Sequence, residues 1–96
     1  MYSIEKKISE DGKIITLILS GDLIINYISE IKENFPEPKP ENEFIFIIKE
    51  VDAFDYSFIQ FFAYYLKLLQ SNNIKYHYEM NEYLEDTIKY FYNDLL

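Results

Sequence analysis

The residues best suited to chemistry lie in the stretch EVDAFDYSFIQFF, residues 50–62. Ser57 supplies a hydroxyl two residues after Asp55, where an acidic segment runs into a predicted helix. Such a hydroxyl can accept a phosphoryl group, or it can cap the helix by accepting a hydrogen bond from the backbone amide of Gln60. The letters SFIQ fit a capping box, in which the Gln60 side chain returns to the amide of Ser57. Both interpretations of Ser57 stay open at this point.

Other signals of catalysis are few. His77 is the single histidine and there is no cysteine, so neither a thiolate metal site nor a nucleophile–histidine triad can be assembled. We expect His77 to be a solvated residue on the polar side of a strand. The two glycines, Gly12 and Gly21, cannot build a phosphate-binding loop. We therefore predict no enzyme, no catalytic residue, no metal and no cofactor.

Length and charge narrow the class of protein. The chain has 96 residues, of which 49% are hydrophobic, and this is enough for one domain over residues 1–96 with one core. A balance of 17 acidic against 9 basic residues gives a net charge of −8, which repels nucleic acid and anionic lipid head groups. The start lacks an apolar signal segment, and no apolar run reaches the roughly 20 residues of a membrane span. We expect a cytoplasmic protein that does not insert into membranes or bind nucleic acid.

Hydrophobic periodicity predicts the elements that position Ser57. Residues 2–8 alternate weakly, the pattern breaks at Asp11-Gly12, and the β-rich run 14–19 follows; together these segments indicate a hairpin. A helix follows as far as Phe35, and a proline-rich loop then leads to the apolar run 44–48, which is typical of a central strand buried on both faces. A second helix that starts at Ser57 and ends at Asn72-Asn73, a strand over 74–80 and a last helix capped by Asn81 complete the order β-β-α-β-α-β-α. This order predicts an α/β fold with a mixed four-stranded sheet covered by helices. Along the last helix we expect Leu84, Ile88, Phe91 and Leu95 to form one apolar stripe.

The helix that starts at Ser57 carries two apolar stripes. Helical spacing places one stripe on the core side: Ile59, Phe62, Ala63, Leu66 and Leu69. A second stripe is centred about 115° away and is expected to be only partly covered: Phe58, Phe61, Tyr65 and Leu68. Either neighbouring helices or the proline loop bury this second stripe, or it forms a surface for a protein partner.

The order of elements and two short motifs resemble the STAS domain family, which includes the bacterial anti-sigma factor antagonists. LSGDL, residues 19–23, stands where that family has Leu-x-Gly-x-Leu after its hairpin, and FDYSF, residues 54–58, stands in the loop after the central strand. The resemblance covers essentially the whole chain and implies that Ser57, with Asp55 beside it, is a phosphorylation site. Phe58 replaces a family glycine, and Ile24 and Ile47 replace polar positions, so the chain resembles a divergent member.

The resemblance also implies a function. We expect a non-enzymatic interaction module that docks on an anti-sigma kinase or a related regulator and is switched by phosphorylation of Ser57. The expected partner-binding residues come from the loop and helix at 55–68: Asp55, Tyr56, Ser57, Phe58, Phe61, Tyr65 and Leu68. In the alternative, the chain is an unphosphorylated structural subunit, such as the accessory subunit of a lipid-transport ABC system, or a homodimeric scaffold.

Overall fold

A computed structural model describes residues 1–96, and its first unit is the predicted hairpin. Strands β1 (Tyr2–Ile8) and β2 (Ile14–Leu23) pair antiparallel along their length. The connecting loop is held by Ser9, whose hydroxyl donates to the Asp11 carboxylate at 2.6 Å and accepts from the amide of Ile14 at 2.9 Å. Gly12 supplies the left-handed backbone that this turn requires, with φ at +76°.

Helices and further strands follow the hairpin. They are the 3₁₀ turn η1 (Ile25–Tyr27), α1 (Ile28–Glu33), β3 (Glu43–Ile48), β4 (Val51–Phe54), α2 (Tyr56–Ser71), β5 (Tyr76–Met80) and α3 (Glu82–Phe91). The main strand order is β1-β2-β3-β5, with β3 parallel to both β2 and β5. The predicted mixed α/β architecture is therefore confirmed.

One strand was not predicted. The sheet has a fifth member, β4, which pairs parallel with the end of β2 in a segment that the sequence indicated as turn-prone. The pairing begins where the amide of Gly21 donates to the carbonyl of Glu50 at 2.9 Å, and its register shifts between Gly21 and Asp22. β4 ends at Phe54, and α2 begins two residues later at Tyr56.

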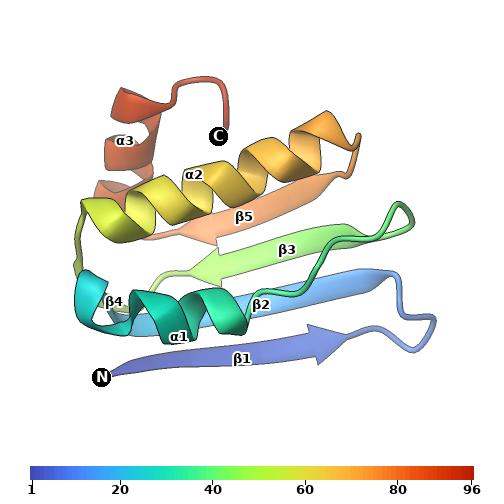
Figure 1. The fold of residues 1–96 in the computed structure, drawn as a ribbon, viewed down its shortest axis with the longest axis horizontal. Helices are drawn as coiled ribbons and strands as arrows, with labels where there is room; N and C mark the ends of the chain where they lie inside the picture. Colours follow the sequence, from blue (N-terminus) through green and yellow to red (C-terminus); the bar gives the residue numbers. More distant parts are fainter.

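All three helices lie on one side of the sheet, as Figure 1 shows. Buried and exposed positions accordingly alternate along β2 and β3, and the buried ones face the helices: Ile15, Leu17, Leu19, Phe44, Phe46 and Ile48. The prediction that β3 is buried on both faces is wrong, because Ile45 and Ile47 point to the side without helices and remain partly exposed. We call this second side of the sheet the open face; its central side chains are Ile14, Thr16, Ile18, Ile45 and Ile47.

The core lies between the sheet and the helices. The predicted core stripe of α2 is confirmed, since all five of its residues are buried. Asn81 caps α3 as predicted, accepting from the amide of Leu84 at 3.0 Å. The predicted apolar stripe of α3 is wrong at Phe91, which is half exposed because the helix ends there and the chain turns back to bury Leu95 instead. None of the helices is long and apolar enough to cross a membrane.

Candidate functional site

Asp55 organises the junction between β4 and α2. Its Oδ1 atom accepts hydrogen bonds from the backbone amides of Ser57 and Phe58, at 3.1 and 3.4 Å, and from the Ser57 hydroxyl at 2.5 Å. Its Oδ2 atom accepts from the backbone amide of Ile25 at 2.8 Å. One carboxylate therefore joins the first turn of α2 to η1, a segment 30 residues earlier in the chain.

The predicted capping box at Ser57 is wrong. The residue that caps α2 is Asp55, with an extended backbone, while Ser57 already lies within the helix. The Ser57 hydroxyl donates to Asp55 instead of accepting from Gln60. A carboxylate is the stronger acceptor for free helix amides, because its hydrogen bonds are charge-assisted and its charge offsets the helix dipole.

The same contacts keep Asp55 ionised. Partial burial of the carboxyl raises its pKa, but the hydrogen bonds from the Ser57 hydroxyl and from the amides of Ile25, Phe58 and Ser57 together outweigh burial. The net effect is a pKa below the ordinary value of an aspartate. Asp55 is thus a fixed negative charge within hydrogen-bond distance of the Ser57 hydroxyl.

Ser57 also lines a shallow groove between η1, α1 and α2. The groove has a volume of about 380 Å³, and we call it the Ser57 groove; its lining is Ile25, Ile28, Lys32, Ser57, Gln60, Phe61 and Tyr64. Two large side chains beside Ser57 are mostly in solvent, Ile25 at 61% and Tyr64 at 67% exposure. The Lys32 ammonium lies 5.8 Å from the centre of the Phe61 ring and is the single cation of the lining.

The second stripe of α2 is covered more fully than predicted. Phe58 is 0% exposed and Tyr65 is 5% exposed, so the expectation that these two residues form a docking surface is wrong. Phe58 stacks on Phe62 with ring centres 5.6 Å apart. Phe35 packs edge-on against Tyr65 at 4.9 Å, and the Tyr65 hydroxyl donates to a carbonyl of the proline loop. Phe35, just after α1, and the proline loop therefore cover the Tyr65 end of the stripe, while Phe58 packs against Phe62 in the core.

The other predicted partner residues separate into three places. Asp55, Ser57 and the partly exposed Phe61 lie together at the Ser57 groove. Tyr56 is half exposed but turns toward the end of α3, where its hydroxyl lies 3.1 Å from that of Tyr92. Leu68 is partly buried, three helical turns beyond Ser57.

Sequence reasoning missed Ile25 and Tyr64. Tyr64 lies on the solvent side of α2, and a lone exposed tyrosine carries no signal until its neighbours are known. Ile25 reaches the groove only because η1 folds against Asp55, a contact between residues far apart in sequence.

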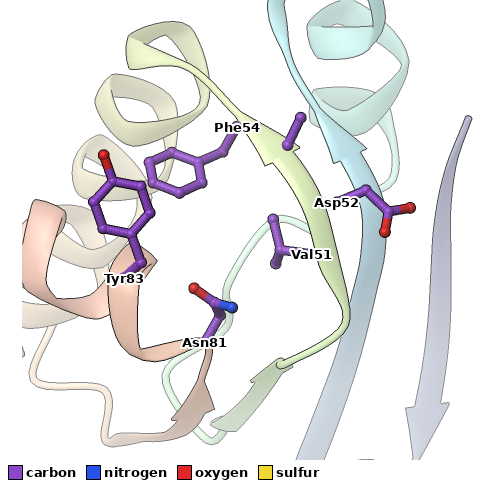
Figure 2. Close-up of a pocket in the computed structure, with 6 residues that line it drawn as sticks. Val51, Asp52, Phe54, Asn81 and Tyr83 are labelled. Carbon is purple, nitrogen blue, oxygen red and sulfur yellow. The ribbon is translucent and has the colours of Figure 1, made fainter.

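A second hollow lies between β4 and the start of α3, with a volume of about 300 Å³. Figure 2 shows the rings of Phe54 and Tyr83 side by side at this hollow, with ring centres 5.4 Å apart, while its one charged residue, Asp52, points away from Tyr83. His77 is exposed on β5, where its Nε2 lies 2.8 Å from a Glu43 carboxylate oxygen. It belongs to the open face, and Ser57 lies on the helix side, so the two do not meet. No cluster of His, Cys, Asp and Glu is arranged to bind a metal.

Solved structures resemble this arrangement. A STAS-domain antisigma-factor antagonist from Rhodobacter sphaeroides superimposes with a TM-score of 0.69 at 12% identity, over 81% of this chain and 85% of that chain. The chain therefore has a STAS-like fold. A structure of a protein named Mglu matches with a TM-score of 0.63 at 16% identity over 79% of this chain, which spans only 19% of that chain. No family model and no curated protein sequence matches the chain. The STAS-like fold is thus held by a divergent sequence.

Proposed function

We propose that this chain is a non-enzymatic protein–protein interaction module that docks through the Ser57 groove and is switched by phosphorylation of Ser57. The observation that carries the proposal is the pairing of Ser57 with two large exposed apolar or aromatic side chains, Ile25 and Tyr64, at one groove. Aromatic and aliphatic groups that become desolvated on docking supply most of the energy of an interface. The similarity to an antisigma-factor antagonist supports a regulatory protein, such as an anti-sigma kinase, as the partner.

The switch follows from the Asp55 contacts. Phosphorylation removes the proton that the Ser57 hydroxyl donates to Asp55 and adds about −1.5 to −2 charges beside that ionised carboxylate. Repulsion would move the Asp55 carboxylate and loosen its bond to the Ile25 amide. Lys32 lines the same groove and is the nearest available counter-charge for the phosphoryl group. Phosphorylation would therefore reshape the floor of the groove as well as change its charge.

The groove is tested by affinity purification from the native cell. The unmodified chain is expected to capture a protein that Tyr64→Ala and Ile25→Ala each fail to capture, because both changes remove exposed contact area without opening the core. The matched control is Tyr90→Ala, since Tyr90 is also an exposed tyrosine but lies on α3 and does not line the groove. Equal capture by all three variants and the unmodified chain would refute docking at this groove.

A structural subunit without phosphorylation is the second candidate. The hydrogen bond from Ser57 to Asp55 favours it, because a helix-stabilising contact accounts for the serine without any modification. Ser57→Asp separates the two: release of the partner supports the switch, and unchanged binding supports the structural subunit. The intact mass of the protein purified from its cell then shows directly whether Ser57 carries a phosphoryl group.

A further inference from the structure

The open face of the sheet has an apolar centre and a charged rim. Its centre consists of Ile18, Ile45, Ile47 and Thr16, which neighbour one another across β2 and β3. None of these side chains takes part in the core, and Ile14 at one end is 39% exposed. No helix or loop covers this face (Figure 1). A contiguous apolar surface framed by charges is typical of an interface.

On β1, β3 and β5, the open face carries one basic and one acidic side chain at different positions along the strand. They form three pairs on the open face: Lys7 and Glu5 on β1, Glu43 and Lys49 at the two ends of β3, and His77 and Glu79 on β5. The strand register sorts these residues into rows that run across the sheet, which we call levels. Lys7 and His77 lie in the same row as Ile45. Glu5 and Glu79 lie in the same row as Ile47. Lys49 follows β3 by one residue and belongs to the same face, since its ammonium lies 3.5 Å from Glu79.

This pattern has the symmetry of a self-complementary surface. Consider a two-fold axis that runs across the strands, midway between the levels of Ile45 and Ile47. It places Ile45 of one copy over Ile47 of the other, and Lys7 over Glu5. The same rotation places Glu43 over Lys49 and His77 over Glu79. Two-fold interfaces require such a match of a surface with itself.

We propose that two copies of this chain stack their open faces about this axis to form a homodimer. The charges also favour a two-fold axis across the strands over one parallel to them. A two-fold axis parallel to the strands would instead place Glu5 over Glu79, a repulsive pair of like charges, and would leave Lys7 over His77 without an acidic partner. Stacked sheets pack with their strands within about 30° of each other, so the matched pairs stay within reach after twisting.

The present ion pairs of the rim do not oppose dimerisation. Lys7 contacts Glu5 at 3.6 Å with both side chains about three-fifths exposed, and such surface pairs exchange partners at little cost. The four strands lie about 4.8 Å apart, and residues of one face recur about every 6.8 Å along each strand. Four strands and four such residues per strand give each copy a contact area on the order of 400 Å². This is smaller than a standard interface of about 800 Å² per partner, so we expect a weak, concentration-dependent dimer.

Analytical ultracentrifugation of the full chain over a wide concentration range tests the proposal. We expect the mass to rise from that of the 11.6 kDa monomer toward twice that value. Glu5→Lys places like charges over Lys7 of the second copy and should weaken the dimer about tenfold. The double change Glu5→Lys with Lys7→Glu restores the opposite charges and should restore the dimer. The matched control is Glu37→Lys in the proline loop, which makes the same charge change away from the open face.

Ile47→Lys tests the apolar centre, because it inserts two like charges by symmetry and should abolish the dimer. Thermal unfolding followed by circular dichroism checks that each variant is folded. A chain that stays monomeric at every concentration would overturn the proposal, including one that instead binds a different protein through this face. A dimer that resists both Glu5→Lys and Ile47→Lys would overturn it as well, since it would use another surface. The Ser57 groove lies on the helix side, so either result leaves the proposed docking function untouched.

Discussion

Replacing Asp55 by alanine removes four hydrogen bonds that one side chain accepts. Loss of a helix cap costs about 0.5–2 kcal/mol, typically about 1. The Ile25 amide also loses its partner, although water can replace much of that bond because the contact is exposed. We therefore expect Asp55→Ala to lower the free energy of unfolding by about 1–2 kcal/mol. For a domain of this size, that corresponds to a fall in Tm of about 5–15 °C.

The stabilisation by Asp55 should depend on pH. Its pKa in the folded protein is lowered, so its contribution is fully present above the pKa of the unfolded chain, about 3.9. The contribution is lost as the pH falls through the lower pKa of the folded state, because a protonated carboxyl no longer attracts the helix amides. Asp55→Asn keeps the shape without the charge. Its deficit relative to the wild type should therefore be largest near neutral pH and should shrink below about pH 4.

Urea unfolding followed by circular dichroism, at a series of pH values, measures both effects. Asp52→Ala is the matched control, because it removes an exposed carboxylate three residues earlier, for which no hydrogen bond or ion pair is found. The reasoning fails if Asp55→Ala is no more costly than Asp52→Ala. It also fails if the deficit of Asp55→Asn is the same at every pH.

Three further predictions concern the packing around the site. Phe58→Ala should lower the free energy of unfolding by about 3–5 kcal/mol in urea, since the side chain is fully buried; a loss under about 1 kcal/mol would contradict that burial. Burial raises the pKa of Tyr65, so an ultraviolet alkaline titration should find one tyrosine that ionises only as the protein unfolds above about pH 10, and Tyr65→Phe should remove that step. Gly21→Ala should cost clearly more than Gly12→Ala: both residues have positive φ, but only at Gly21 would a Cβ atom collide with a neighbouring carbonyl, and equal Tm values would refute this close approach.

The predictable part of this fold is the part with a periodic apolar pattern. The core stripe of α2 repeats its apolar residues at helical spacing, and all five are buried. The apolar run 44–48 correctly indicated a strand, but it has no alternation, so it could not show that Ile45 and Ile47 face away from the core. β4 escaped prediction because four residues, VDAF, carry no recognisable period. It forms through pairing with the end of β2, and this pairing depends on the register shift after Gly21.

The candidate site was predictable in location but not in detail. Asp55 and Ser57 are both typical helix caps, and which of them caps α2 depends on where β4 ends, a tertiary property. The burial of Tyr65 likewise depends on Phe35 and the proline loop folding back over α2. Periodicity describes one helix at a time, so it cannot show which neighbour covers a second apolar stripe.

The placement of every helix on one side of the sheet determines what a dimer could connect. If two copies stack through their open faces, both Ser57 grooves point outward, away from each other. Such a dimer cannot clamp one small partner from two sides, so avidity on a single target is excluded by geometry. It would instead bridge two separate targets, one at each groove, and would hold them on opposite sides of the paired sheets.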